Sequence, residues 1–263
     1  MLEFGVDEAG KGPVLGSMFA AAVVADPADL PDDVGDSKDI APDRRTELDE
    51  QIREIADEVA VAEIPVVRID DEETDMNSLT VAAHAEALGP ALADADETSG
   101  TDLADLSGYV DAGDTNAVRF ERRVEDAVTT ELGHSDDSPF DIRGEHGADE
   151  SYPIVGAASI VAKVARDAHV DGLADRYGDV GSGYPSDPTT RDFLETYVER
   201  EDGLPPCARA SWKTSRDVLA ARSQSSLGEF EPDGGRIDAP EDEPTAETDG
   251  GRAEPRPTTL DEF

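Results

Sequence analysis

Near its start the chain reads Gly5-Val6-Asp7-Glu8-Ala9-Gly10-Lys11-Gly12-Pro13-Val14-Leu15-Gly16, in which two acids and one cation border a glycine-rich turn. The apolar residues 2–6 predict a short buried strand that ends at Asp7, and residues 17–25 predict a second strand beyond the turn. A rigid sheet directs the side chains at its strand ends into one crevice. Asp7 and Glu8 are therefore candidate functional acids.

Strands and helices alternate along the residues that follow. Residues 107–110 predict a strand that ends at Asp111, and residues 59–69 predict one that Pro65 interrupts, which is typical of an edge or a bulge. Apolar residues at helical spacing predict helices over residues 44–58, 77–93, 116–132, 153–177, 189–200 and 211–222. This alternation indicates an α/β or α+β domain.

The charge balance is extreme, because 63 acids face 22 bases in 263 residues and give a net charge of −41. High net charge opposes collapse and is typical of disordered chains, but periodic apolar segments run through most of this sequence. We therefore interpret the charge as the surface of a protein from an organism that lives in high salt. At ~1 M salt the Debye length is only about 3 Å, so repulsion between surface carboxylates is screened.

Composition also excludes several classes of protein. No apolar stretch approaches the ~18 to 20 residues that span a bilayer, and the opening MLEFGVDEAG lacks the basic and apolar regions of a signal peptide. The single Cys207 excludes an intramolecular disulfide framework and a four-cysteine zinc site. We expect a cytoplasmic protein that does not bind membranes.

The composition changes after about Arg222. Residues 223–263 are rich in Asp, Glu, Pro and Gly and hold few large apolar side chains, so they cannot bury a core. We expect one folded domain over residues 1–222 and a disordered acidic tail over residues 223–263.

Acids also lie next to two later elements. Asp111 follows the strand 107–110 with Asp114 close behind, and Asp149 precedes the long helix next to Glu150. Most acids of such a chain are solvated surface charges, so position alone leaves Asp114 and Glu150 open as alternatives. Clustered carboxylates suit phosphodiester hydrolysis, in which two Mg²⁺ ions ~3.5 to 4 Å apart hold the attacking and leaving oxygens.

The opening segment closely resembles the signature of ribonuclease HII, the type 2 ribonuclease H family, and further pieces follow in the family's order. These pieces are Asp36-Ser37-Lys38, Tyr109-Val110-Asp111-Ala112, Ala148-Asp149, Tyr152-Pro153-Ile154-Val155, Ala157-Ala158-Ser159-Ile160-Val161-Ala162-Lys163, Gly181-Ser182-Gly183-Tyr184-Pro185 and, in an archaeal form, Ser211-Trp212-Lys213. The resemblance covers residues 1–222 and leaves the tail aside.

The resemblance implies an α/β, ribonuclease H-like fold, in which a mixed sheet is flanked by helices and followed by a small C-terminal helical part. It implies a monomeric endonuclease that hydrolyses the RNA strand of RNA–DNA hybrids. The enzyme would also cut 5′ to ribonucleotides embedded in duplex DNA, leaving a 3′-hydroxyl and a 5′-phosphate. The catalytic and metal-binding acids are then Asp7, Glu8, Asp111 and Asp149. The cofactor is Mg²⁺ or Mn²⁺, with two ions in the substrate complex.

The same motifs imply a set of substrate contacts. These contacts are Gly10, Lys11, Gly12, Lys38, Ser159, Lys163, Tyr184 and Lys213. Glycine lets the backbone approach the substrate closely, and backbone groups suit the reading of a 2′-hydroxyl. The resemblance implies that Tyr184 packs on the sugar at the RNA–DNA junction. Many family members carry Arg in place of Lys11, and Lys lacks the bidentate fork of Arg.

The four histidines are scattered, and nothing in their spacing marks one of them as a general acid. They are His84, His134, His146 and His169. We expect all four to be surface or packing residues.

Two peptides in the tail resemble the motif that docks on the sliding clamp of DNA replication. Their anchors are Gln224, Leu227 and Phe230 in the first peptide and Leu260 and Phe263 in the second. Isolated apolar anchors in a segment that otherwise cannot fold suit coupled folding and binding. A helix cap at the end of the domain is an alternative for the first peptide.

The metal-dependent ribonuclease is thus the leading hypothesis. An alternative is a clamp-tethered protein that binds RNA–DNA hybrids without turnover, but the presence of all four acids argues against it. Another metal-dependent phosphoryl-transfer enzyme on a similar fold is disfavoured by the glycine-rich turn and by the loop that holds Tyr184.

Overall fold

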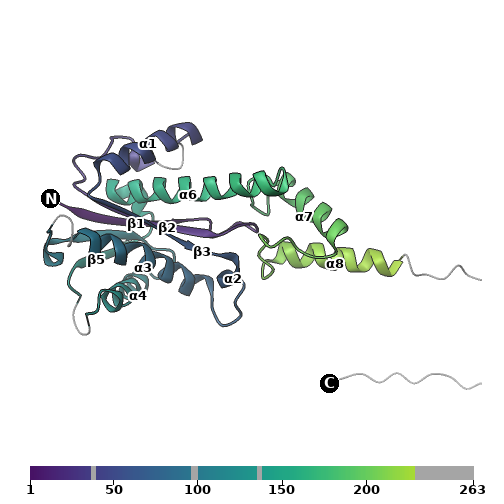
Figure 1. Ribbon diagram of the computed structural model, residues 1–263. Coiled ribbons are helices and arrows are strands. Elements are labelled where there is room, and N and C mark those ends of the chain that lie inside the picture. Colours follow the sequence, from purple (N-terminus) through teal and green to yellow (C-terminus); the bar gives the residue numbers. More distant parts are fainter. Residues whose placement is uncertain (37–39, 96–99, 135–137, 229–263) are drawn as a thin grey trace, which may run out of the picture.

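A mixed five-stranded sheet forms the centre of the computed structural model, which describes residues 1–36, 40–95, 100–134 and 138–228. In spatial order its strands are β3 (Glu58–Ile64), β2 (Met18–Ala25), β1 (Glu3–Ala9), β4 (Ser107–Asp111) and β5 (Asp141–Glu145) (Figure 1). Strands β1, β2 and β3 are antiparallel neighbours, whereas β4 and β5 run parallel to β1. The mixed sheet that the resemblance implied is confirmed.

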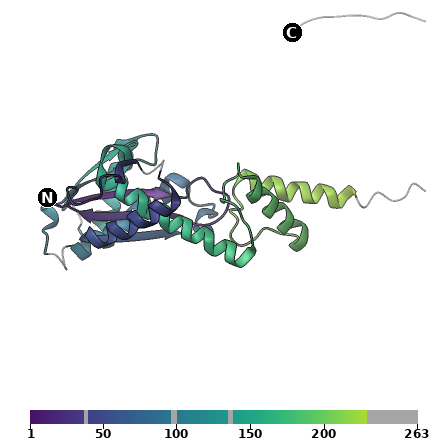
Figure 2. The same cartoon turned by 90° about the horizontal axis from the view of Figure 1, so that it is seen from above.

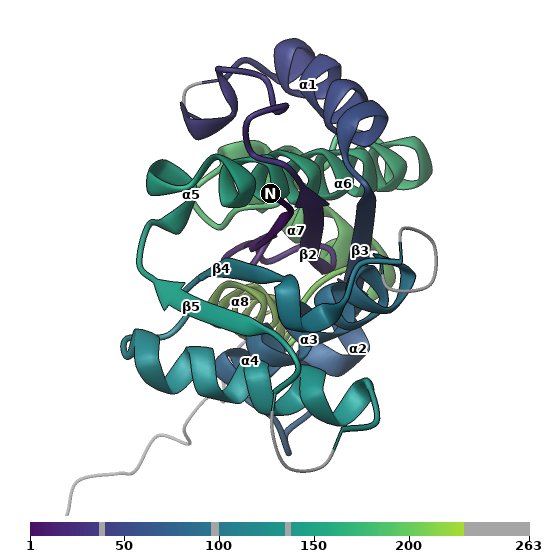
Figure 3. The ribbon, with the colours of Figure 1, turned by 90° about the vertical axis from the view of Figure 1, so that its left-hand side faces the viewer.

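Helices cover both faces of this sheet, with α1 and α6 on one face and α3 and α4 on the other (Figure 3). The helices are α1 (Pro42–Ile55), α2 (Val66–Ile69), α3 (Met76–Asp94), α4 (Ala117–Glu131), α5 (Ala148–Ser151), α6 (Pro153–Tyr177), α7 (Pro188–Glu201) and α8 (Lys213–Gly228), with short 3₁₀ turns at Val34–Asp36 and Leu103–Asp105. Because both faces are covered, the interior strand β2 is buried along its whole length, which its mostly small and β-branched side chains allow.

Helix α6 lies very close to β1 at a glycine. A Cβ atom on Gly5 would overlap the main-chain carbonyl of Ile154, in the first turn of α6. Residues 154–162 of this helix are all buried. The N-terminal half of α6 is therefore held directly against the strand that carries Asp7 and Glu8.

The C-terminal helices α7 and α8 lie beyond the far end of α6, away from the sheet (Figure 2). They pack with that end of α6 around a small apolar cluster. Its buried members are Val14, Leu15, Val180, Leu194, Cys207 and Ala208. Because two of these residues come from the loop after β1, this loop joins the sheet to the C-terminal helical part.

Three elements differ from the prediction. The expected strand 59–69 ends at Ile64, and Pro65 caps the short helix α2 and does not interrupt an edge strand. Proline suits a helix start because its fixed φ is helical and no N–H group is needed there. Strand β5 is absent from the prediction. Helix α8 continues past the expected domain end at Arg222 to Gly228, and the tail after it lies outside the described residues.

Candidate active site

Asp7 lies near the end of β1 and Asp111 at the end of β4, and these two strands are parallel neighbours. Val6 pairs with Val110, so the two acids follow at the same level of the sheet. Asp7 is only 5% exposed, and burial raises the pKa of its carboxyl well above the usual range. The charges of Glu8 and Asp111 add to this rise. Parallel pairing thus brings together acids that are about a hundred residues apart in the sequence.

Asp149 joins these acids from α5, a short helix, where the sequence suggested a loop. Asp111 accepts a 2.8 Å hydrogen bond from the backbone N–H of Ala148, the first residue of that helix. Burial raises the pKa of Asp111, the N–H of Ala148 opposes the rise, and the charges of Glu8 and Asp149 add to it. The four predicted acids therefore lie close enough to interact.

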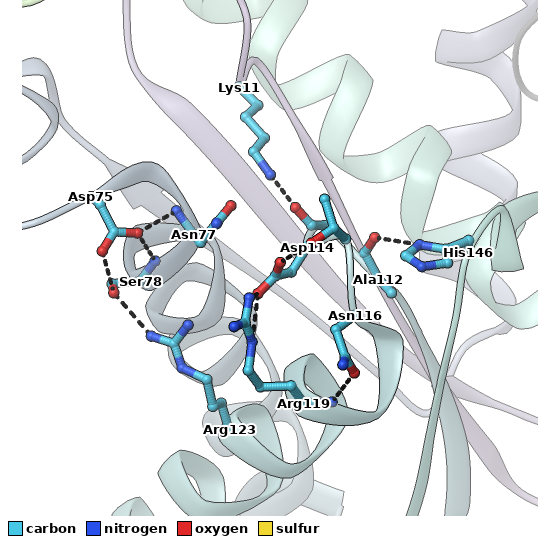
Figure 4. A network of polar contacts seen from close by, with 12 residues as sticks. Lys11, Asp75, Asn77, Ser78, Ala112, Asp114, Asn116, Arg119, Arg123 and His146 are labelled. Carbon is cyan, nitrogen blue, oxygen red and sulfur yellow. Dashed lines mark hydrogen bonds and ion pairs between the residues drawn. The ribbon is translucent and has the colours of Figure 1, made fainter.

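The two alternative acids are placed differently. Asp114 pairs with Arg119 of α4 at 2.5 Å, in the polar network of Figure 4. Glu150 is exposed, whereas its neighbour Asp149 is buried. The structure therefore groups Asp111 and Asp149, and not their sequence neighbours, with the acids of β1.

The four carboxylates suit an open metal site better than a closed cage. Among the described residues, no three Asp, Glu, His or Cys side chains converge closely enough to enclose an ion. Mg²⁺ keeps several waters and is held by one or two carboxylates together with substrate phosphates. A bound cation also relieves the repulsion that raises the pKa values of Asp7 and Asp111. The donor set thus fits a hard divalent ion such as Mg²⁺ or Mn²⁺.

Helix α6 contributes two polar side chains next to Asp7. Ser159 is fully buried, and its hydrogen bond to Asp7 lowers the pKa of that carboxyl. Lys163 donates from Nζ to Oγ of Ser159 at 2.8 Å. Ser159 therefore contacts Asp7, and Lys163, which it binds, lines the hollow beside the acids.

This hollow has a volume of about 370 Å³ and is lined by Glu8, the glycine-rich turn, Lys163 and Tyr184. Two further cations, Arg45 and Arg166, belong to its lining and both pair with Asp167, which also lines the hollow, at 2.7 Å and 3.0 Å; the sequence analysis did not single them out. The guanidinium of Arg166 lies over the Tyr184 ring, 5.1 Å from the ring centroid. Cations of this strongly acidic protein are thus gathered beside the acid cluster.

The other three lysines that were predicted to contact the substrate differ in their position relative to the hollow. Lys11 lines the hollow and donates from Nζ to the carbonyl oxygen of Gly113, in the loop after Asp111 (Figure 4). Lys213 is exposed on α8, pairs with Asp217 at 2.5 Å and is not part of the lining. Lys38 lies outside the described residues.

Two histidines make contacts that the sequence did not indicate, in addition to His146, whose Nδ1 atom lies 3.2 Å from the carbonyl oxygen of Ala112 (Figure 4). His84 of α3 is fully buried, and its Nε2 atom lies 2.8 Å from Oε2 of Glu8. His169 of α6 accepts a hydrogen bond at Nε2 from the backbone N–H of Ser17 at 3.2 Å. Both contacts join distant segments of the chain, so no local pattern signals them.

A mixed sheet of this order, with carboxylates gathered at the ends of β1 and β4, defines a hydrolase of the ribonuclease H type. The family model for ribonuclease HII matches residues 4–215. The chain belongs to the ribonuclease HII family.

Relatives and solved structures agree with this assignment. Ribonuclease HII of Haloarcula marismortui is 62% identical over 229 residues, which cover 87% of this chain and 100% of the relative. The crystal structure of ribonuclease H2 from Pyrococcus horikoshii has 32% identity and a TM-score of 0.70, and the match covers 85% of this chain and 100% of that one. Ribonuclease HII in the PCNA complex from Archaeoglobus fulgidus has 33% identity and a TM-score of 0.67, with 81% and 96% covered.

Membership of this family makes the protein a metal-dependent endoribonuclease that acts on RNA–DNA hybrids. The similarity to a haloarchaeal protein agrees with the acidic composition. Within the described ranges, no helix has the length and apolar character needed to cross a membrane.

Proposed function

We propose that this ribonuclease also cuts duplex DNA on the 5′ side of single embedded ribonucleotides, with two divalent metal ions at the acid cluster. The observation that supports this substrate is the hollow beside the acids, which combines the backbone of residues 10–12 with the ring of Tyr184. A protein that recognises a base sequence needs contacts with base edges. A backbone turn and an aromatic ring instead suit the recognition of one sugar.

The carboxylates of Asp7, Glu8, Asp111 and Asp149 are the proposed metal ligands. Bound Mg²⁺ or Mn²⁺ would activate the attacking water and stabilise negative charge on the leaving oxygen. Attack on phosphorus breaks its bond to the 3′-oxygen of the upstream nucleotide, which takes up a proton and leaves as a 3′-hydroxyl. The phosphate stays on the ribonucleotide as a 5′-phosphate.

The side chains around the hollow have separate proposed roles. Lys163, Arg45 and Arg166 neutralise phosphates along the bound strand. Tyr184 is 40% exposed and offers its ring to the sugar at the junction. Ser159 is buried behind the acids, so we assign it to holding Asp7 and Lys163.

The proposal is tested by cleavage of a DNA duplex that carries one ribonucleotide, in molar KCl with Mg²⁺ or Mn²⁺. We expect metal-dependent cutting 5′ to the ribonucleotide, and its loss in Asp7→Asn and Asp111→Asn. The pair Asp149→Asn and Glu150→Gln is a matched comparison, because the two acids are adjacent but only Asp149 is buried. Glu150→Gln should cut like the wild type.

Two outcomes would contradict the proposal in different ways. A folded wild-type protein that binds the duplex without cutting it would favour the alternative, a hybrid-binding protein without turnover. Cutting of RNA–DNA hybrids alone would keep the ribonuclease and remove the embedded ribonucleotide from its substrates.

We further propose that the tail docks on the replication sliding clamp. A similar ribonuclease HII from Archaeoglobus fulgidus was solved in complex with PCNA. Gln224 of the first candidate peptide lies within α8, whereas Phe230, Leu260 and Phe263 lie outside the described residues. The side chain of Gln224 is exposed, but its backbone is already fixed in α8, so we favour the second peptide.

The two peptides are separated by binding measurements on an archaeal sliding clamp at high KCl. The double substitution Leu260→Ala and Phe263→Ala should abolish binding, whereas Gln224→Ala should leave it unchanged. The reverse pattern would assign docking to the first peptide, and binding by both variants would exclude both peptides.

A further inference from the structure

A segment of the C-terminal helical part reaches back and holds the glycine-rich turn. Arg209 donates from its guanidinium to the carbonyl oxygens of Gly10 at 2.6 Å, Lys11 at 3.0 Å and Gly16 at 2.8 Å. The indole Nε1 of Trp212 donates to the carbonyl oxygen of Gly12 at 3.2 Å. The three consecutive carbonyls of residues 10–12 are therefore all bound by two side chains from about two hundred residues further along the chain.

Arg209 is buried inside the protein. The side chain is fully buried, and its guanidinium lies 4.8 Å from the centroid of the Trp212 ring. Backbone pairing fixes the same segment, since the N–H of Arg209 donates to the carbonyl of Val14 at 2.9 Å. Burial of a guanidinium is tolerated only when its donors are satisfied, and here backbone carbonyls of the turn satisfy them.

The orientation of these carbonyls determines where the N–H groups of the turn point. All peptide bonds in the described residues are trans, so the N–H group of each peptide points opposite to its carbonyl. The N–H groups of Lys11 and Gly12 therefore point away from Arg209. No acceptor in the described part of the chain takes a hydrogen bond from the N–H groups of residues 10–12, which line the hollow together with Tyr184.

We propose that Arg209 and Trp212 are positioning residues for ribonucleotide recognition. Arg209 orients two peptides of the turn so that the N–H groups of Lys11 and Gly12 face the 2′-oxygen of the substrate. Trp212 holds the end of the turn in place through the carbonyl of Gly12, whose peptide nitrogen belongs to Pro13 and carries no hydrogen. This inference rests on the proposed cleavage at single ribonucleotides. It assigns a role in substrate selection to the C-terminal part, which has no residue in the acid cluster.

A turn with this sequence needs such support. Gly10 has a φ of +88°, and glycine rotates more freely than any other residue. A peptide that flips would direct a carbonyl into the hollow and withdraw an N–H donor. The 2′-oxygen of a ribonucleotide would then lose the N–H donor that the turn offers it, whereas contacts with the rest of the duplex would stay the same.

The test compares the cleavage of a ribonucleotide-containing duplex with the inhibition of that cleavage by an all-DNA duplex of the same sequence. Trp212→Phe keeps an aromatic ring but removes one donor, and should lower kcat/KM for the ribonucleotide duplex about fivefold. Arg209→Lys removes the planar fork and should lower kcat/KM by about thirtyfold or more. The inhibition constant of the all-DNA duplex should not change in either variant.

Arg200→Lys and Tyr197→Phe are the matched controls, because Arg200 also lies over an aromatic ring in the C-terminal part but does not contact the turn. Both controls should behave like the wild type. If Trp212→Phe keeps wild-type kcat/KM, or weakens both duplexes equally, the inference is wrong, even if Arg209→Lys fails to fold. Failure of the wild type to cut the ribonucleotide duplex would instead refute the proposed substrate.

Discussion

The carboxylate of Glu8 makes a hydrogen bond with a buried histidine. The Nε2 atom of His84 lies 2.8 Å from Oε2 of Glu8, and its ring meets Phe120 edge to face with centroids 5.0 Å apart. The other ring nitrogen, Nδ1, is buried without a partner among the described residues. A neutral imidazole that donates from Nε2 leaves only a lone pair at Nδ1, so this tautomer fits the site. His84 then orients one oxygen of Glu8 and leaves the other for the proposed metal ion.

We expect His84→Leu to raise the Mg²⁺ concentration for half-maximal activity by about 10- to 100-fold, because it removes the hydrogen bond that orients a ligand. His84→Gln keeps a donor and should retain more of the metal affinity. Titration of cleavage activity with Mg²⁺ measures this difference. Equal metal requirements in the leucine variant and the wild type would show that the contact only packs the core.

Cys207 provides a second prediction at this scale. Its thiol is buried, and burial raises its pKa to about 11 from the ordinary value of 9.0. Below pH 9 the thiol is protonated in both the folded and the unfolded chain, so its contribution to stability is constant. Between pH 9 and 11 the unfolded chain loses the proton first, and the folded state becomes less stable.

The free energy of unfolding of the wild type should therefore fall more steeply than that of Cys207→Ala over this pH window. Chemical denaturation of both proteins at high salt gives the comparison. Parallel pH profiles would mean that the thiol titrates normally in the folded protein.

The sequence predicted Asp7 and Asp111 from local patterns, whereas only the family resemblance separated Asp111 from Asp114 and Asp149 from Glu150. Asp7 follows an apolar strand and Asp111 follows another, and both lie where expected. His84 and Arg209 could not be found in this way. Their importance comes from contacts with Glu8 and with residues 10–12, which only the folded chain brings near.

At the scale of elements, the central strands and long helices were predictable because their apolar residues recur at a regular spacing. Strand β5, with the sequence DIRGE, holds only two buried residues, Ile142 and Gly144, between charged ones. Such a short edge strand carries little apolar signal, and its pairing with β4 supplies the missing information. Helix α2 was misread as strand because three of its four residues, Val66, Val67 and Ile69, are β-branched and the helix follows a strand closely.

Two glycines in contact with α6 or within it should respond in opposite ways to alanine. In Gly5→Ala the new methyl group would overlap the backbone of α6, so we expect a loss of about 1–3 kcal/mol or more in the free energy of unfolding. Gly172 lies within α6 with open space around it, so Gly172→Ala should gain about 0.5–1 kcal/mol. Urea denaturation at constant salt measures both, and a neutral Gly5→Ala would show that α6 can shift away from β1.

At the scale of the whole molecule, salt should affect the repulsion within the net charge of −41 more strongly than it affects the acid cluster. Repulsion between surface carboxylates opposes folding, and its range shrinks as the Debye length falls from about 10 Å at 0.1 M salt to about 3 Å at 1 M. Asp7 is buried and Asp111 is half-buried, so salt screens this cluster less than it screens the surface.

We expect the melting temperature to rise steeply with KCl between these concentrations, while kcat at saturating Mg²⁺ changes little wherever the protein is folded. Phosphate contacts weaken as salt rises, so an enzyme adapted to molar salt should rely more on metal coordination and hydrogen bonds. Thermal denaturation and cleavage assays over the same series measure the two effects. A protein that melts at the same temperature throughout the series would contradict the halophilic interpretation.

Helix α6 begins beside Asp149 and ends at the C-terminal helical part, so its 25 residues span roughly 37 Å at 1.5 Å per residue. Its register therefore sets the spacing and the angle between the acid cluster and the C-terminal residues that line the hollow beside it. Insertion of a single residue after Val164 would turn everything beyond it by about 100° and displace Arg166 and the loop of Tyr184. The length of this helix is consequently far less free to drift in evolution than the length of any surface loop, and insertions should accumulate outside it.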